Sequence, residues 1–235
     1  GRNLDVLIKY RNDKRYLSVG NMLDKENKAI YGLEFSYETI PNELNLFDYD
    51  AFKAYKGDFY CVVTNLLTCE AEYMKYTGED RTNTVLKATC ALPMLFPPII
   101  INDTPYMDGG LTDSIPFMRA LEDGCDRVLV VLTREAGYTK TTSTSTKAIA
   151  RYYEKEYPKL SEVMLSRAER YNECLKQLKE YEDSGKVMVI RPAVSKGFSR
   201  LEKDKNKILS MYNDGYNQGY TLTGDIKKFF NYSNS

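Results

Sequence analysis

The sequence has 235 residues, of which 43% are hydrophobic and 28% are charged, so it is long and apolar enough to bury a sizeable core. Lysine plus arginine equals aspartate plus glutamate at 33 each, which leaves no overall field to recruit nucleic acid or an anionic membrane. There is no histidine, which excludes Ser-His-Asp catalysis, Cys-His catalysis and imidazole-based metal sites within these residues.

Five cysteines are scattered along the chain, and no two of them form a C-x-x-C pair. This usage predicts reduced thiols of an intracellular protein, most of them buried in the core. The longest apolar run, residues 91–101, is too short to cross a bilayer. No secretory signal is visible in the charged first residues, so we expect a cytoplasmic location.

The first hundred residues contain several predicted elements. Residues 31–44 are expected to be extended, with a turn at Pro41, and residues 47–55 to form a short helix. The β-branched and aromatic stretch 58–67 predicts a strand, and the residues that follow it predict a hairpin partner. Residues 81–95 predict a helix that ends at Pro93.

The middle of the chain alternates short strands with helices. Two short strands joined by a turn lead into Asp108, and a helix follows with Ser114 as its N-cap and Gly124 just past its end. The apolar run "DRVLVVLT", residues 126–133, predicts a strand covered on both faces. This order of strand, helix and strand indicates an α/β fold with a largely parallel sheet. The length by itself predicts one large domain or two small ones.

The last hundred residues are mostly helical in pattern. The Thr/Ser-rich residues 133–147 predict a loop, and residues 158–185 show helical spacing of apolar side chains, closed by Gly185. A strand is expected over 186–193 and a final helix over 199–220.

The stretch "YMDGGLTDSIP", residues 106–116, places a carboxylate at the end of a predicted strand. An aspartate before glycine often only accepts a backbone hydrogen bond in a turn. However, open α/β sheets form their sites at the carboxyl ends of strands. Two glycines after Asp108 also let the backbone turn away without a side chain. Both readings of Asp108, turn former and site residue, stay open at this point.

A family resemblance favours the site reading. The stretch "ATCALPMLFPPIIINDTPYMDGGLTDSIPFMRALEDGCDRVLVVLTR" resembles the C-terminal half of a patatin-like phospholipase domain, in its bacterial branch. The segments "GRNLDVLIKYRNDKRYLSVGNML", "FYCVVTNLLTCEAEY" and "IRPAVSKGFSRLEKDKNKILSMYNDGYNQG" agree with it, so the likeness covers nearly the whole chain. The resemblance implies a single domain over residues 1–235, truncated at its N-terminus, with a three-layer α/β/α fold. It also implies a lipid acyl hydrolase that uses a Ser-Asp dyad.

Each implied role falls on a matching position of this sequence. Asp108 would be the dyad aspartate, and Gly109 and Gly110 would shape the loop that carries it. The acyl pocket would be lined by four residues of the preceding run: Leu92, Pro93, Met94 and Phe96. The family chemistry uses no metal and no organic cofactor, and the implied partner is a lipid or other acyl-ester substrate, with peripheral membrane contact as an option.

The sequence departs from the family pattern in one important respect. It contains no G-x-S-x-G motif and no glycine-rich oxyanion loop, and its "GYNQG", residues 215–219, has Asn217 at the centre. We therefore expect a fragment whose N-terminal strands, nucleophile and oxyanion donors belong to a missing segment, either a separate or a cleaved piece. A carboxylate without its nucleophile has nothing to activate, so we expect these residues alone to be inactive.

Two other functions remain as alternatives. One is a non-catalytic patatin-like protein that binds lipid or a partner in the same cleft. The other is an unrelated α/β domain that binds a small anionic ligand, although no G-x-G-x-x-G or P-loop supports it. The remaining polar candidates are interpreted as surface or turn residues: Asp103, Asp113, Lys87, Arg119 and Arg191.

Overall fold

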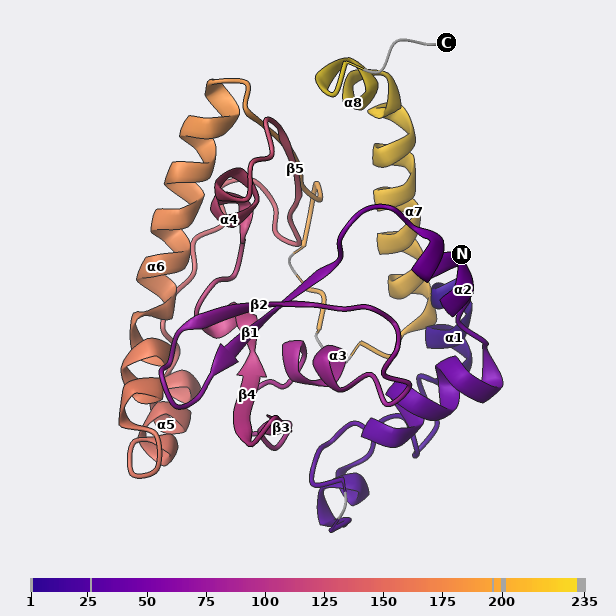
Figure 1. The fold of residues 1–235 in the computed structure, drawn as a ribbon, viewed down its shortest axis with the longest axis vertical. Helices are drawn as coiled ribbons and strands as arrows, with labels where there is room; N and C mark the ends of the chain where they lie inside the picture. The colour runs from indigo at the N-terminus through magenta and orange to yellow at the C-terminus, as the bar shows by residue number, and fades with distance from the viewer. Residues whose placement is uncertain (1, 26, 196, 200–201, 232–235) are drawn as a thin grey trace. The chain divides into compact units, whose positions relative to one another are not determined.

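The computed structural model describes residues 2–25, 27–195, 197–199 and 202–231, and it is a mixed α/β structure (Figure 1). The chain divides into two compact units. The first, here called the antiparallel unit, comprises Lys9–Ser114 and Thr142–Arg167. The second, here called the parallel unit, comprises Gly1–Ile8, Ile115–Thr141 and Ala168–Ser235. Each is described below by itself.

The antiparallel unit is built on a four-stranded sheet with the order β2-β1-β4-β3, in which every pair is antiparallel. Its strands are β1 (Tyr60–Asn65), β2 (Ala71–Lys75), β3 (Ile99–Ile101) and β4 (Thr104–Asp108). The predicted hairpins β1–β2 and β3–β4 are confirmed. Asn102 and Asp103 turn the second hairpin with φ of 49° and 61°, the positive values that a two-residue hairpin loop needs.

Helices pack against this sheet and form its core. Helix α3 (Thr84–Thr89) confirms a helix in this region but is shorter than the predicted 81–95, and it contributes the fully buried Ala88 beside Val63. A second cluster joins Met107 to α5 (Thr144–Tyr153) and to α6 (Pro158–Asp183), whose residues up to Arg167 belong to this unit. The predicted loop 133–147 is wrong at its end, because Ser143 accepts a hydrogen bond from Thr146 N (3.1 Å) and starts α5 there.

The N-terminal part of the chain is more helical than the sequence predicts. It contains α1 (Arg2–Tyr10), η1 (Val19–Leu23), η2 (Phe35–Leu44) and α2 (Tyr49–Ala54). The expected extended segment 31–44 is wrong, since η2 is a π-helix with Pro41 inside it. Phe35 and Ile40 lie five residues apart and are both buried, which suits the wider π-helical turn. The short helix around 47–55 is confirmed as α2.

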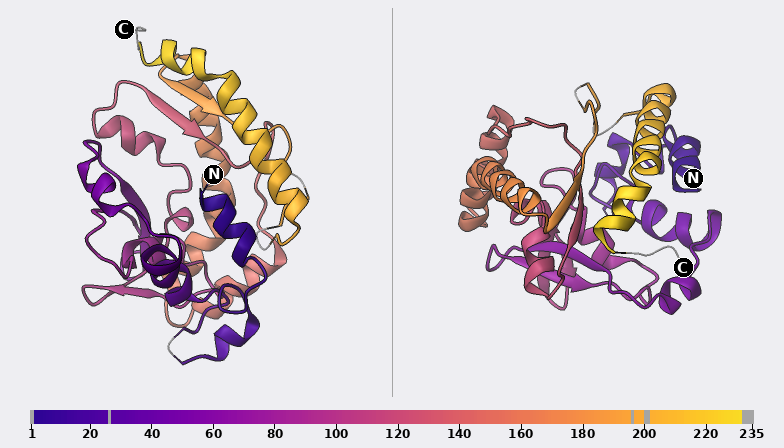
Figure 2. Two further views of the ribbon diagram at one scale, coloured as in Figure 1. Left: turned by 90° about the vertical axis from the view of Figure 1, so that its right-hand side faces the viewer. Right: turned by 90° about the horizontal axis from the view of Figure 1, so that it is seen from above.

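The parallel unit contains the one parallel strand pair of the described residues, β5 (Val128–Val131) with β6 (Val187–Ile190). Its helices are α4 (Phe117–Glu122), α7 (Lys205–Thr221), α8 (Thr223–Phe229), the remainder of α6 and α1 as far as Ile8 (Figure 2). Phe117, Leu178 and Val187 are each 2% exposed or less and belong to one apolar cluster. Gly185 follows α6 with a positive φ of 74°, as predicted.

Two expectations about the sheet need correction. A largely parallel sheet was expected, but in the described residues parallel pairing is confined to β5–β6. The strands β1–β2 and β3–β4 instead form hairpins, whose short turns make these pairs antiparallel. Strand β5 was expected to be covered on both faces, yet Val131 is 68% exposed. The three-layer arrangement and the missing N-terminal strands stay predictions. No helix in the described part of the chain is long and apolar enough to cross a bilayer.

Candidate active site around Asp108

Asp108 lies where the sequence places it, as the last residue of β4. It pairs with Val63 of β1, and its side chain is half-buried. Its Oδ1 accepts a hydrogen bond from Gly110 N (2.6 Å), so the carboxylate caps the short helical turn η3 (Gly109–Leu111). This bond is what a simple turn former makes, and it also fixes the direction in which the carboxylate points.

Gly109 is required by space, and Gly110 is closely surrounded by side-chain atoms. A Cβ on Gly109 would lie 2.2 Å from Val62 O, a backbone atom of β1 that cannot move aside. A Cβ on Gly110 would lie 2.9 Å from Asp108 Oδ1. Glycine at both positions therefore lets the turn pass directly beside β1 while the carboxylate folds over it. The D-G-G turn, defined here as Asp108–Gly110, is thus closely fitted to its neighbours.

Side chains of the sheet hold the start of the D-G-G turn and the residues just after the turn. Thr64 is fully buried, and its Oγ1 donates to Asp108 O (2.9 Å). The same Oγ1 lies 2.9 Å from Thr112 Oγ1, from which it can accept a hydrogen bond. Tyr73 OH donates to Asp113 Oδ2 (2.6 Å). The expectation that Asp113 is a solvated turn residue is therefore wrong, because β2 presents a tyrosine hydroxyl to it.

The carbonyl of Gly110 is the second anchor of the turn. It accepts hydrogen bonds from Ser114 Oγ (2.7 Å) and from Arg167 Nε of α6 (2.5 Å). The predicted N-cap role of Ser114 is wrong: α4 begins after Pro116 without a side-chain cap, and Ser114 is engaged by the turn instead. Arg167 was not identified from the sequence. It lies nearly sixty positions from Asp108, and the helical pattern of α6 gave no sign of its partner.

A cysteine thiol also lies near the carboxylate. Cys90, just past α3, keeps exposed surface as a residue, yet the protein around its sulfur raises the pKa of the thiol. A hydrogen bond with Tyr37 lowers that pKa, while the negative charge of Asp108 raises it further. Cys90 therefore stays a neutral thiol at ordinary pH and is a poor nucleophile.

The cysteines as a group differ in part from the prediction. All five are free, as expected. Cys61 and Cys69 are buried, but Cys90 and Cys125 are exposed and Cys174 is half-buried, so the expectation that most are core residues is wrong. Burial raises the pKa of the Cys61 thiol to about 11, with a further contribution from nearby Cys90.

The four residues predicted to line an acyl pocket lie in different surroundings. Phe96 is buried in an apolar cluster with Ala91, and Leu92 packs against that cluster. Met94 is 43% exposed, has a positive φ of 65° and donates its backbone N–H to Tyr153 OH (3.3 Å). Pro93 is half-buried. Their role as pocket lining stays a prediction.

The three cations interpreted above as surface residues each have an ion-pair partner. Lys87 pairs with Glu38 (2.6 Å), and Arg119 pairs with Asp123 (2.8 Å). The guanidinium of Arg191 lies 3.1 Å from a carboxylate oxygen of Glu182. Their interpretation as surface residues is therefore refined to that of members of local ion pairs.

The comparisons with known proteins identify the region that holds this site. Residues 9–121 match the family model described as patatin-like phospholipase. This part of the chain is patatin-like. The match contains Asp108, both glycines and all four of the predicted pocket residues. Residues 157–231 match a second family model, described as a domain of unknown function (DUF6363). No curated protein matches the chain.

The two matches meet in the antiparallel unit. Asp108 and Gly110 belong to the patatin-like match, whereas Arg167 belongs to the match of unknown function. The hydrogen bond from Arg167 Nε to Gly110 O therefore joins them at the patatin-like D-G-G turn. The prediction of a single domain over residues 1–235 stays a prediction.

Proposed function

We propose that this protein is a patatin-like acyl hydrolase of lipid esters in which Asp108 is the carboxylate of a Ser-Asp dyad. The observation that carries the proposal is a half-buried carboxylate at a strand end, held by a closely fitted turn inside the patatin-like match. Such preorganisation is what a catalytic group needs, because small displacements of a reacting group are costly in rate.

In the proposed reaction, the serine Oγ attacks the ester carbonyl carbon while Asp108 takes the serine proton. The negative charge that develops on the carbonyl oxygen is held by backbone N–H donors. The alcohol then leaves with the proton from Asp108, and an acyl-serine remains. Water attacks this ester with Asp108 again as the base, which releases the fatty acid and restores the serine. This chemistry requires no metal and no organic cofactor.

The nucleophile is proposed to come from polypeptide outside the 235 residues. These residues contain no G-x-S-x-G motif. In addition, β5 is an apolar strand with Val131 68% exposed, and a parallel pair of only two strands is unusual without further covering. We infer that further parallel strands, which bear the serine and the oxyanion donors, cover this sheet. Residues 1–235 alone would then be inactive.

The lipid ester is the proposed substrate class, with transient contact at a membrane surface. The free cysteines support a reducing compartment, so the cytoplasm is the proposed location.

The proposal is tested with a fluorophosphonate probe, which labels activated serines, applied to the native protein that contains these residues and to the 235-residue chain. We expect labelling of one serine in the native protein and none in the shorter chain. Asp108→Asn should slow labelling at least about 100-fold, since the general base is lost. Asp103→Asn is the matched control, because Asp103 is exposed in the β3–β4 turn and asparagine tolerates its positive φ.

Each result has a clear reading. Labelling that Asp108→Asn abolishes and Asp103→Asn preserves would support the dyad. Normal labelling of Asp108→Asn would remove Asp108 from the mechanism. An unlabelled native protein would favour the alternative, a non-catalytic patatin-like protein that binds lipid or a partner.

A further inference from the structure

Arg167 is a side chain that the match of unknown function contributes to the D-G-G turn. It is half-buried on α6, and its Nε donates to Gly110 O at 2.5 Å. Its Nη2 also lies close to Gly110, since a Cβ built on Gly110 would lie 3.1 Å from Arg167 Nη2 and 2.9 Å from Asp108 Oδ1. The guanidinium and the carboxylate therefore both lie on the side of Gly110 that a Cβ would occupy.

We propose that Arg167 is a positioning residue for Asp108, and that this is the contribution of the domain of unknown function to the patatin-like site. The inference rests on the proposed function, since it needs Asp108 to act as a base. It assigns a role to α6, the first helix within the match described as a domain of unknown function.

Arg167 would act on Asp108 in two ways. Through Nε it fixes the carbonyl of Gly110, and Gly110 N in turn holds Asp108 Oδ1 (2.6 Å), so the orientation of the carboxylate depends on the arginine. Its Nη2 and Asp108 Oδ1 both lie close to the place that a Cβ on Gly110 would occupy, so the guanidinium limits the space in which the carboxylate can turn.

Arginine suits this double contact better than lysine does. Its guanidinium is planar and carries donors in a fixed fork, so one side chain can bond the carbonyl and face the carboxylate together. Lysine would keep the charge as a single point and lose the fixed geometry. Because Ser114 Oγ also donates to Gly110 O (2.7 Å), the carbonyl would keep one partner without Arg167, and the turn would loosen without unfolding.

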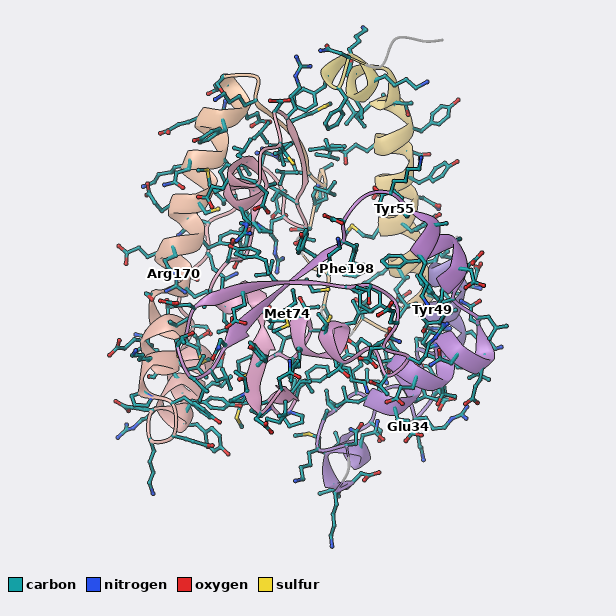
Figure 3. All side chains as sticks on the ribbon, viewed as in Figure 1. Glu34, Tyr49, Tyr55, Met74, Arg170 and Phe198 are labelled. Atoms are coloured by element: carbon teal, nitrogen blue, oxygen red, sulfur yellow. The ribbon has the colours of Figure 1, made fainter. Side chains whose placement is uncertain are left out.

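The experiment measures hydrolysis of p-nitrophenyl butyrate by the native protein with Arg167→Met, Arg167→Lys, Asp108→Asn or Arg170→Met. Arg170 is the matched control because it lies on the same helix, α6, and is exposed (Figure 3). We expect Arg167→Met to lower kcat about 10- to 100-fold and to change KM less than about twofold. Arg167→Lys should be intermediate, and Arg170→Met should match the unchanged protein.

Chemical rescue separates positioning from simple structural support. Millimolar methylguanidinium should restore part of the kcat of Arg167→Met, should do nothing for Asp108→Asn, and should leave thermal melting of both variants unchanged. An unchanged kcat in Arg167→Met would overturn the inference. It would also be overturned if Arg167→Met lost activity that methylguanidinium does not restore and Arg167→Lys lost as much activity as Arg167→Met. If Arg167→Met fails to fold, the kcat of Arg167→Lys tests the inference instead. A lowered kcat would support the positioning role, and a kcat equal to that of the unchanged protein would count against it. A protein whose activity survives Asp108→Asn would instead refute the proposed function.

Discussion

The antiparallel unit and the parallel unit differ in how far their sheets are completed by the residues described. In the antiparallel unit, β1 has neighbours on both edges, and Val63, Thr64 and Met107 are fully buried. In the parallel unit, β5 pairs with β6 alone among the described strands, and Val131 is 68% exposed. The strand with the more uniformly apolar sequence is thus the less covered one.

Chain connectivity explains this difference. Antiparallel partners can follow one another through short turns, so a local stretch of chain can complete its own sheet. Parallel partners need long crossovers, and their neighbours come from distant parts of the chain. The D-G-G turn is consequently held by groups of its own unit, from Thr64 to Arg167, whereas the parallel unit leaves an apolar strand for further polypeptide to cover.

The largest effect expected from this comparison is on stability, when a buried apolar side chain of the antiparallel unit and an exposed one of the parallel unit are replaced. Met107→Ala should destabilise the 235-residue chain by about 3 kcal/mol or more, because Met107 is fully buried among Leu111, Leu160 and Met164. Val131→Thr should change stability by less than about 0.5 kcal/mol, because Val131 is exposed. Urea denaturation measures both. A larger cost for Val131→Thr than for Met107→Ala would reverse the comparison.

A smaller effect is expected at the glycines. Gly109→Ala should cost about 2–3 kcal/mol, because the new Cβ would lie 2.2 Å from Val62 O and the strands would have to shift. Gly124 of the parallel unit has a φ of +94° and no atom within 4 Å of a new Cβ, so Gly124→Ala should cost about 1 kcal/mol from backbone strain alone. Equal midpoints of urea denaturation for the two variants would show that the D-G-G turn can accommodate a Cβ at Gly109, contrary to the prediction.

The smallest effect concerns pH and the antiparallel unit. Burial tends to raise the pKa of Asp80, but hydrogen bonds from Thr82 and Thr84 outweigh it and lower the pKa from 3.8 to about 2. A lowered folded-state pKa adds stability above pH 3.8, and this stability is lost as the pH falls through about 2. Because Asp80 is largely exposed, solvent screening limits the gain to less than about 1 kcal/mol.

Asp80→Asn should therefore reduce stability at pH 6 by that small amount and have a weaker effect near pH 2. Thermal melting at both pH values checks it. A destabilisation that is larger near pH 2 than at pH 6 would contradict the direction of the shift.

The sequence by itself determined most local elements and the place of Asp108. The hairpin β1–β2, the turn at Asn102 and Asp103, helix α6 with Gly185 behind it, and the aspartate at the end of β4 follow from patterns a few residues long. Turn chemistry and apolar periodicity are local properties, so they can be read without knowing what lies across the fold.

Only the tertiary structure decided which distant groups meet. It bent residues 35–44 into a π-helix around Pro41, turned Ser114 from a helix cap into a partner of Gly110, and brought Arg167 to the same carbonyl. It also made the larger sheet antiparallel by pairing β1 with β4. These outcomes depend on burial and on hydrogen bonds between residues far apart in the chain, which no short sequence pattern encodes.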